Sequence, residues 1–429
     1  MRKLQLGRAR LSLGADNVSP SALDDCYSKA LYTRLPYYKS LVALSIPRHN
    51  MSTPRCVAST LDIDTERSHE SEDSPIPDVS GNNFYKEAQW SPDGTCLITN
   101  SADNGIRTFV VPSDLLEEDK QPHDLIPYSI ITSPEPVKAF DCYTGYNLAD
   151  PSTALILSSQ RDHPTRLSNA LDGRKVASYP LINPTTEAFI SPHSLLFSRG
   201  GSHFVAGSEN LISVFDVSRV GEAQISYLPT SPKRSSGVMG MRGIISALDI
   251  DDSSGILAAG TFSRHVGLYD NGGQGDCVGV FCVQGTDADE EIGGAGITQV
   301  KWSSDGRYLY IAERRSDGVM FYDIRKTGQL LGWLVGRNAR TNQRLGIDVV
   351  NVESGTNIWA GGMDGYIRRW LNPHEHQGSV ESSMEWRGQD DAVSSVVGHQ
   401  SGSALASCSG QRQVEDKTTG HALKIWSWK

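Results

Sequence analysis

Arginine recurs in short polar segments that interrupt the apolar stretches of this chain. The clearest examples are S-S-Q-R-D-H-P (158–164), R-N-A-R-T-N-Q-R (337–344) and S-G-Q-R (409–412). A guanidinium group presents its N–H donors in a planar fork, which suits bidentate contacts with phosphate or with the edge of guanine. These segments therefore indicate a surface that binds a polyanion, provided that the fold brings them together.

The sequence shows no signature of catalysis or of cofactor binding. It contains no G-x-x-x-x-G-K-[ST], G-x-S-x-G or H-E-x-x-H, and no G-x-G-x-x-G opens a helix after a strand. His374-Glu375-His376 offers two histidines, but no third or fourth ligand follows at a useful spacing, so we expect a solvated loop there. We predict a protein that is not an enzyme, with no metal, no cofactor and no small-molecule substrate.

The bulk composition is that of an acidic globular protein with a formal net charge of −10 and no apolar run long enough to span a membrane. The seven cysteines form no C-x-x-C pair, so we expect buried, reduced thiols. The first 13 residues carry four basic and no acidic side chains. This pattern leaves two alternatives open, a mitochondrial presequence or an extension upstream of a true start at Met51.

A repeat of about 49 residues begins at residue 84. Its clearest copies are F-Y-K-E-A-Q-W-S-P-D-G (84–94) and G-I-T-Q-V-K-W-S-S-D-G (296–306), in which a Trp ends a strand and D-G marks a tight turn. Five weaker copies begin near residues 137, 188, 243, 345 and 392. Each unit reads as four short strands that bury both faces only when stacked on neighbours. The sequence therefore predicts an all-β, seven-bladed WD40-type β-propeller over residues 84–429.

Residues 1–83 form an N-terminal leader of different composition. Positions 62–80 hold seven acidic residues and one arginine, which is typical of a disordered segment. The chain ends at Lys429, directly after the third strand of the last unit, which leaves that sheet one strand short. We predict that the largely disordered leader supplies the closing strand from within 54–61.

Many cations should lie on one face of such a propeller. The turn after the second strand of each blade and the link to the next blade both emerge on that face, and the cations fall in these loops. Eleven cations fall in these positions: Arg161, Lys233, Arg234, Arg242, Arg264, Arg314, Arg315, Arg337, Arg340, Arg344 and Arg412. The segment T-D-A-D-E-E (286–291) adds four acids to that face, and Asp162 and Asp317 lie beside arginines. A nucleic-acid-binding face and a protein-binding face both remain open on these residues alone.

The loop segments resemble those of the telomerase Cajal body protein family. The resemblance covers residues 84–429 and rests on the three arginine segments above and on N-S-A-D-N (100–104), with T-N-Q-R and S-G-Q-R as its most specific pieces. It implies a WD-repeat scaffold in the nucleus that binds small Cajal-body RNA and telomerase RNA; some distant relatives are linked to pre-mRNA splicing particles. The family positions carried over are Arg161, Asn342, Gln343, Arg344, Gln411 and Arg412.

Together, the loop sorting and the resemblance predict a nuclear scaffold for small nuclear RNA or telomerase RNA and for ribonucleoprotein proteins, with no membrane partner; the cytoplasm stays open as a second location. The alternative is a protein-interaction propeller of a splicing or other nuclear complex that does not contact RNA. The predicted RNA-binding residues are Arg161, Arg264, Arg314, Arg315, Arg340, Asn342, Gln343, Arg344, Gln411 and Arg412.

Overall fold

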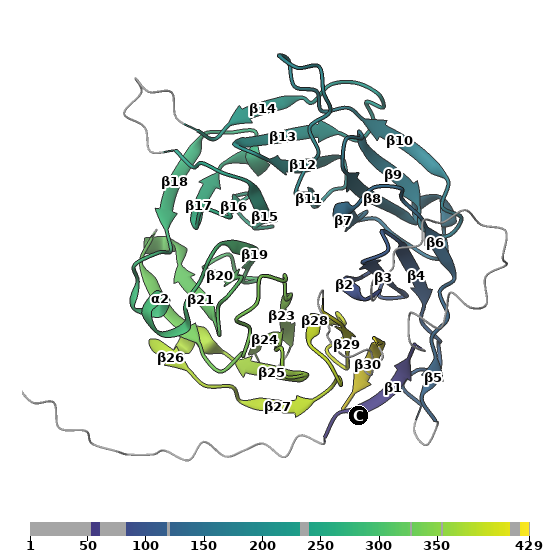
Figure 1. The fold of residues 1–429 in the computed structure, drawn as a ribbon, viewed down its shortest axis with the longest axis vertical. Helices are drawn as coiled ribbons and strands as arrows, with labels where there is room; N and C mark the ends of the chain where they lie inside the picture. Colours follow the sequence, from purple (N-terminus) through teal and green to yellow (C-terminus); the bar gives the residue numbers. More distant parts are fainter. Residues whose placement is uncertain are drawn as a thin grey trace, which may run out of the picture. The chain divides into compact units, whose positions relative to one another are not determined.

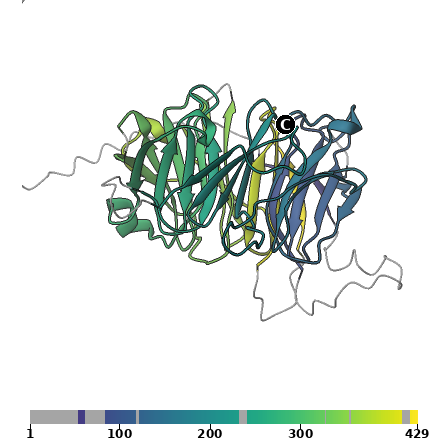
Figure 2. The same ribbon diagram turned by 90° about the horizontal axis from the view of Figure 1, so that it is seen from above.

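Seven four-stranded antiparallel units surround a central axis in the computed structural model, which describes residues 53–60, 83–117, 121–231, 240–326, 328–352, 355–411 and 421–428 (Figure 1). Seen from the side, the strands of the blades run between the two faces of the ring (Figure 2). The prediction of an all-β, seven-bladed propeller is confirmed. The expected disorder of the leader concerns residues 1–52 and 61–82, which lie outside the described residues.

Each blade runs from an inner strand at the axis to an outer strand at the rim. Blade 1 consists of β2 (Tyr85–Trp90), β3 (Cys96–Ser101), β4 (Ile106–Val110) and β6 (Ser129–Ile131). Blade 2 consists of β7 (Val137–Cys142), β8 (Leu155–Gln160), β9 (Thr165–Asn169) and β10 (Lys175–Tyr179). Blade 3 consists of β11 (Ser194–Phe197), β12 (His203–Ser208), β13 (Leu211–Asp216) and β14 (Ser226–Pro229). Blade 4 consists of β15 (Ile245–Ile250), β16 (Leu257–Thr261), β17 (His265–Tyr269) and β18 (Cys277–Cys282).

The last three blades follow the same plan, and two of them gain a fifth strand. Blade 5 consists of β19 (Ile297–Trp302), β20 (Tyr308–Glu313), β21 (Val319–Asp323), β22 (Leu330–Leu334) and the added β26 (Gly378–Val380). Blade 6 consists of β23 (Ile347–Val352), β24 (Gly355–Gly361), β25 (Tyr366–Leu371) and β27 (Met384–Arg387). Blade 7 consists of β28 (Val393–Gly398), β29 (Ala404–Ser409), β30 (Leu423–Ser427), β1 (Arg55–Ser59) and the added β5 (His123–Asp124). The helical pieces of the described chain are α2 (Asp287–Ile292) and the 3-10 turns η2 (Pro151–Thr153), η3 (Asn271–Gly273), η4 (Ile324–Lys326) and η5 (Pro373–Glu375).

Local turn chemistry sets the hairpin between the first two strands. In S-P-D-G, the Ser91 hydroxyl donates to Asp93 Oδ1 at 2.5 Å, and the same oxygen accepts the N–H of Thr95 at 3.1 Å. Gly94 has a φ of 73°, a conformation that glycine adopts without steric cost. Asp93 Oδ2 also accepts the N–H of Leu148 at 2.7 Å, so this turn is tied to the next blade.

Strand alternation packs each blade between its two neighbours. In β13, Leu211 and Phe215 belong to an apolar cluster with residues of blade 2, whereas Ile212 and Val214 belong to a cluster with residues of blade 4. Both faces of the sheet are therefore buried, as expected for a blade that cannot bury them alone. The strand tryptophans pack in the same way, and Trp370 is fully buried.

A segment of the leader completes the last blade. Strand β1 pairs antiparallel with β30, with Arg55 opposite Ser427 and Ser59 opposite Lys424. It lies within the 54–61 window in which we expected the closing strand. The N–H of Thr60 donates to Leu423 O at 2.9 Å, and the Thr60 hydroxyl accepts the Leu423 N–H at 3.0 Å. These bonds extend the pairing of β1 with β30 and close the sheet of blade 7.

Two smaller expectations need correction. Cys277 and Cys282 are exposed, because they lie on the outer strand β18 at the rim, whereas Cys96, Cys142 and Cys408 are buried as expected. His374 is not simply solvated: its ring stacks on Tyr308 with the centroids 4.7 Å apart, because η5 folds that loop against blade 5.

Candidate nucleic-acid interface

The turn between β20 and β21 lies beside the link from β22 to β23. The turn carries Arg314 and Arg315, and the N–H of Arg315 donates to Thr341 O in the link at 2.8 Å. Arg315 has a φ of 55°, which is uncommon for a residue with a β-carbon, and its side chain is exposed. The turn and the link thus contribute to one surface, at the same end of blade 5.

Two arginines converge on one aromatic ring at this surface. The guanidinium carbon of Arg314 lies 4.6 Å from the Phe262 ring centroid, and that of Arg344 lies 5.5 Å from it. Arg314 Nε donates to Ala295 O at 2.9 Å and Arg344 Nη2 donates to Ser246 O at 3.3 Å. The ring face attracts both cations, which offsets part of their repulsion. Among the described residues no carboxylate pairs with either guanidinium group, so most of their donors can serve a ligand.

Gly296 allows this close approach. Its φ is 138°, and a β-carbon there would lie 2.8 Å from Phe262 O and 3.1 Å from Arg314 Nε. Its N–H donates to Glu313 Oε1 at 3.1 Å, so the backbone is held from both sides. A side chain at 296 would crowd the Phe262 carbonyl and Arg314, and the φ of 138° would be strained for a residue with a β-carbon.

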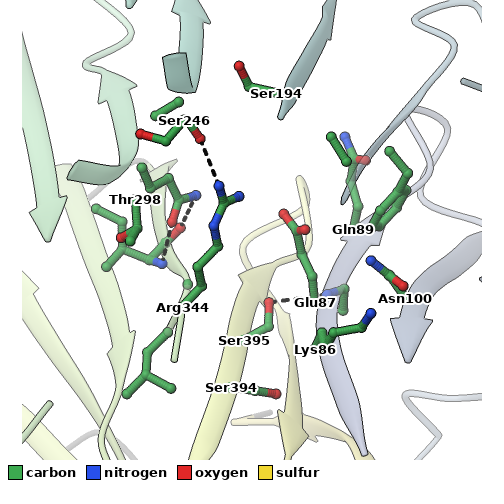
Figure 3. Close-up of a pocket in the computed structure, with 18 of the residues that line it drawn as sticks. Lys86, Glu87, Gln89, Asn100, Ser194, Ser246, Thr298, Arg344, Ser394 and Ser395 are labelled. Carbon is green, nitrogen blue, oxygen red and sulfur yellow. Dashed lines mark hydrogen bonds between the residues drawn. The ribbon is translucent and has the colours of Figure 1, made fainter. Parts of the chain in front are cut away.

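Arg344 reaches from this surface into a polar cavity of about 920 Å³ at the propeller axis. Residues of all seven inner strands line the cavity, and Figure 3 shows the Arg344 side chain reaching Ser246 of β15 while Glu87 of β2 projects into the same space. Burial lowers the pKa of Arg344, and the Glu87 carboxylate acts in the opposite direction. Desolvation within the channel raises the pKa of Glu87, against the effect of Arg344. The cavity therefore presents an anionic and a cationic group to whatever enters it.

Lys301 of β19 lies among carboxylates around the same axis. Burial acts to lower the pKa of Lys301, but Asp249, Asp348 and Asp141 raise it above its usual range. Each of these carboxylates also accepts a backbone N–H from the following blade: Trp302 for Asp249 at 2.7 Å, Gly398 for Asp348 at 2.8 Å, and Phe197 for Asp141 at 2.7 Å. The charged groups of the channel thus join adjacent blades as well as lining a cavity.

The buried carboxyl of Asp141 should give the fold a measurable pH dependence. Burial raises the pKa of Asp141 to about 6, against hydrogen bonds from Gln89 and Phe197 that favour the charged form. Because the native pKa lies above the unfolded value, this stabilisation is complete below about pH 4 and is lost as the pH rises through about 6. Between about pH 4 and about pH 7.5, this component lowers the unfolding free energy of the wild type by about 2–3 kcal/mol. We expect Asp141→Asn to abolish this component, and urea unfolding at the two pH values measures it.

The control for this measurement is Asp162→Asn, since the Asp162 side chain is exposed and bears on no buried pair. It should leave the pH profile of the wild type unchanged. A profile for Asp141→Asn that runs parallel to the wild type would contradict the prediction.

The segments T-N-Q-R and S-G-Q-R meet in the structure. Gln343 Nε2 donates to Gly410 O at 2.8 Å, and Gln411 Nε2 donates to Asp391 Oδ1 at 2.7 Å. Asn342, which precedes Gln343 in the link, is exposed and lines the same cavity. Arg412 lies outside the described residues, so its position relative to Arg344 stays a prediction.

Two other predicted arginines are exposed but already paired. Arg340 Nε contacts Asp317 Oδ2, and Arg161 Nε lies 3.4 Å from Asp162 Oδ2. Arg161 belongs to the β8–β9 turn of blade 2, and no contact in the described residues links it to the Arg314–Arg344 pair. Pairs of this kind on the surface are weak, so a phosphate can compete for either guanidinium.

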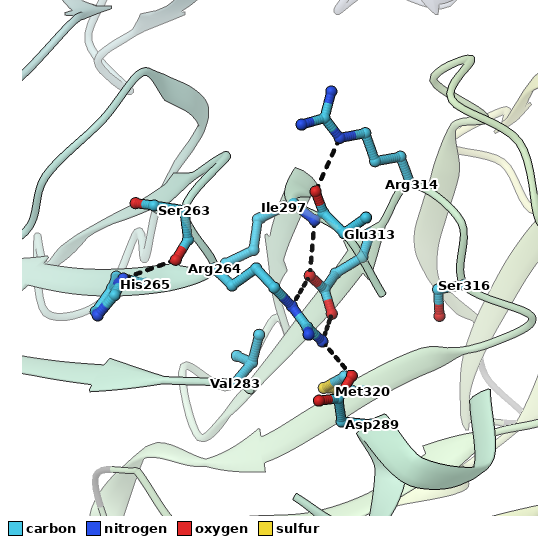
Figure 4. Close-up of polar contacts among 12 residues, drawn as sticks. Ser263, Arg264, His265, Val283, Asp289, Ile297, Glu313, Arg314, Ser316 and Met320 are labelled. Carbon is cyan, nitrogen blue, oxygen red and sulfur yellow. Dashed lines mark hydrogen bonds and ion pairs between the residues drawn. The ribbon is translucent and has the colours of Figure 1, made fainter. Parts of the chain in front are cut away.

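Arg264 differs from the exposed arginines, because its side chain is nearly buried in an internal ion-pair network; a contact of Arg264 with RNA stays a prediction. Its guanidinium forms a fork with both carboxylate oxygens of Glu313 at 2.7 Å and contacts Asp289 Oδ1 at 2.6 Å (Figure 4). Arg264 is 9% exposed, because α2 folds over it in the link between blades 4 and 5. Asp289, one of the acids of 286–291, therefore belongs to this internal network.

Arg337 is likewise internal, although the loop sorting counted it among the cations of the face. It is 1% exposed, and its guanidinium donates to Gly361 O at 3.2 Å and to Leu345 O at 2.5 Å. Burial lowers the pKa of Arg337 to about 10. Its contacts anchor the link that carries Asn342, Gln343 and Arg344.

Sequence reasoning missed Phe262 and Glu87. Phe262 lies two residues before Arg264 and carries no local signal, since its role depends on arginines from two other segments. Glu87 gave a weak signal: it is a charged residue within the inner strand of a blade, where an exposed side chain has only the channel to face.

In the described part of the chain, no group of three or more His, Cys, Asp or Glu side chains is placed to hold a metal ion. Across the same residues, no helix has both the length and the apolar composition that crossing a bilayer requires.

Comparison with known proteins places the chain in a family. No family model matches it. Guanine nucleotide-binding protein negative regulator 1 of Schizosaccharomyces pombe is 32% identical over 296 residues, 68% of this chain and 71% of that protein. Telomerase Cajal body protein 1 is 30% identical over 342 residues in Rattus norvegicus and 29% identical over 341 residues in Homo sapiens. These two alignments cover 78% of this chain and 60% and 58% of the mammalian proteins, so the chain spans less than two thirds of their length. With this identity over most of the propeller, the chain belongs to the telomerase Cajal body protein family.

Proposed function

We propose that this protein is a nuclear scaffold without enzymatic activity that binds small non-coding RNA, of the small Cajal-body RNA or telomerase RNA type, together with its ribonucleoprotein partners. Its role would be to localise or assemble the ribonucleoprotein. The observation that carries the proposal is the convergence of Arg314 and Arg344 on Phe262 at the edge of a polar channel.

The chemistry of this arrangement suits single-stranded RNA. Guanidinium groups bind phosphate oxygens and stack on bases, and unpaired loops expose both. Arg315 and Asn342 are exposed beside the pair and add donors to the same surface. A fixed pair of arginines loses less side-chain entropy on binding than two free ones, which favours affinity.

The names of the relatives support the RNA class and the compartment. The mammalian proteins are named for telomerase and for the Cajal body, and they align with most of this propeller. The net charge of −10 makes non-specific attraction of a polyanion to the whole body unfavourable, so binding must rely on the local cluster.

The test uses a labelled RNA hairpin with an unpaired loop and the full chain. We expect Arg344→Gln and Arg314→Gln each to weaken binding by about 5- to 30-fold, because each removes a charge-assisted contact of about 1–2 kcal/mol. The logarithm of the affinity should fall linearly with the logarithm of the salt concentration, with a shallower slope in each variant. Fluorescence anisotropy over a salt series measures both quantities.

The matched control is Arg325→Gln. Arg325 is exposed, but it lies in η4 between β21 and β22, at the opposite end of the blade from Arg314. It should bind the hairpin like the wild type. Equal losses in all three variants, or wild-type binding that does not change with salt, would refute the proposal.

A second candidate is a protein-interaction propeller that does not touch RNA. The pairing of Arg340 with Asp317 and of Arg161 with Asp162 favours it, since these arginines are partly neutralised in the free protein. Partners that stay attached after RNase treatment, with no hairpin binding, would select this candidate.

A further inference from the structure

The outer strands of the blades present a row of edges, and most of these are protected. Unpaired edge strands attract other strands, so proteins usually cover, charge, shorten or interrupt them. The devices in this protein are β5 on β1, β26 on β22, the Gly221 N–H that donates to Ser178 O on β10, Pro229 in β14, Glu385 and Arg387 in β27, and the three-residue length of β6.

Strand β18 of blade 4 has no covering strand, charge or proline within the described residues; its register with β17 shifts once, at Val278, and is regular from Gly279 to Cys282. Its sequence is C-V-G-V-F-C, without a charge or a proline, and no described strand pairs with its outer side. Val278 is 56% exposed, and Cys277 and Cys282 are exposed at the ends of the strand. Figure 1 shows β18 on the outer rim of the ring.

Backbone alternation leaves hydrogen-bonding groups on this open edge. The Val283 N–H donates inward to Arg264 O at 3.0 Å. Because successive residues of a strand point their N–H and C=O groups to opposite sides, Cys282 and Val280 direct theirs away from β17. The edge thus offers backbone donors and acceptors flanked by apolar side chains.

Acidic residues stand at both ends of the strand. Asp270 and Asp276 are exposed before β18, and Asp287 and Glu290 are exposed after it. The charge pattern is therefore acidic, apolar, acidic along the direction of the strand. Two copies of this chain paired through β18 would bring these acids together in either orientation, which disfavours a homodimer at this edge.

We propose that β18 is a docking edge for an extended segment of a partner protein, which adds to blade 4 as a parallel fifth strand. The segment has an apolar centre of about five residues and basic residues at both ends, complementary to the acids that flank β18. The parallel orientation follows the example within the fold itself: β26 pairs parallel with β22, and β5 pairs parallel with β1. This site is separate from the arginine surface and does not depend on RNA binding.

The probe is a fluorescent peptide of sequence Lys-Arg-Val-Thr-Val-Thr-Val-Arg-Lys, measured against the full chain by anisotropy. We expect Val278→Lys to weaken its binding about tenfold or more, since a lysine on the edge opposes the basic ends and the apolar contact. Val176→Lys is the matched control: Val176 is a similarly exposed valine, at 47%, on the protected outer strand β10. A second readout is amide hydrogen exchange, in which the peptide should slow exchange at Val280 and Cys282.

Two comparisons decide the result. A peptide with glutamates in place of its basic residues should bind about tenfold more weakly, because it repels the flanking acids. Equal losses in Val278→Lys and Val176→Lys, equal binding of the two peptides, or no protection at Val280 and Cys282 would overturn the proposal. Thermal unfolding shows that the variants are folded, and wild-type RNA-hairpin binding by Val278→Lys shows that the arginine surface is intact.

Discussion

Replacing Arg264 with leucine is expected to lower the free energy of unfolding by about 3–5 kcal/mol. Arg264 satisfies both carboxylate oxygens of Glu313, whose side chain is 1% exposed, and it also holds Asp289 of α2. Removing only the cation leaves a buried carboxylate without its partner, and desolvation of that charge is then uncompensated. Urea unfolding at neutral pH measures the loss.

The same network predicts the direction of the pH effect. Burial already raises the pKa of Glu313, and Arg264 is the group that most opposes this rise. Without Arg264 the native pKa rises further, so the native state binds a proton more tightly and the variant loses less stability at mildly acid pH than at neutral pH. The defect should therefore shrink as the pH is lowered.

Two variants serve as controls for Arg264→Leu. Arg325→Leu removes an exposed arginine from its pair with Asp323 and should change stability by no more than about 0.5 kcal/mol. The double variant Arg264→Leu, Glu313→Leu should recover part of the loss, because no buried charge remains. A single variant as stable as Arg325→Leu would contradict a structural role for this fork.

The second large effect concerns the strand that closes the ring. Ala58 is fully buried in β1, in an apolar cluster with Leu423 and Ile425 of β30. Ala58→Asp places a carboxylate there without a partner, and we expect a loss of about 3 kcal/mol or more. Amide hydrogen exchange in β30 should quicken along with the fall in unfolding free energy, because the edge of blade 7 opens.

The control for the closing strand is Arg55→Asp. It introduces the same side chain at the exposed first position of β1, so we expect a change of no more than about 0.5 kcal/mol. Equal stability of Ala58→Asp and Arg55→Asp would mean that β1 is dispensable for the ring. Unchanged exchange in β30 would lead to the same conclusion.

The Arg264 network also supports the arginine surface, because the two are neighbours in the fold. Glu313 directly precedes Arg314, and its carboxylate holds the Gly296 backbone against which Arg314 lies. Arg264→Leu should therefore weaken RNA binding as well, although the Arg264 side chain is nearly buried. An RNA affinity equal to that of the wild type in this variant would separate the network from the surface.

The sequence by itself determined the features that depend on local turn chemistry and on the number of repeated units. The D-G turns and the strand alternation are read within a few residues, and seven such units that cannot bury their faces alone require a closed ring. The repeat count left the last sheet one strand short, and the closing strand β1 (Arg55–Ser59) lies within the predicted window 54–61. The end of the blade at which each turn emerges followed from the antiparallel order of the strands.

Only the tertiary structure decided which arginines stay available. Arg264 and Arg314 occupy equivalent turns of adjacent blades, yet Glu313 and α2 bury the first, while Phe262 displays the second. The burial of a cation depends on partners far away in sequence, and loop lengths and turn residues carry no information on such partners. The same reason hid Glu87, whose electrostatic influence on Arg344 exists only because the ring brings the first blade close to a link that lies about 250 residues later.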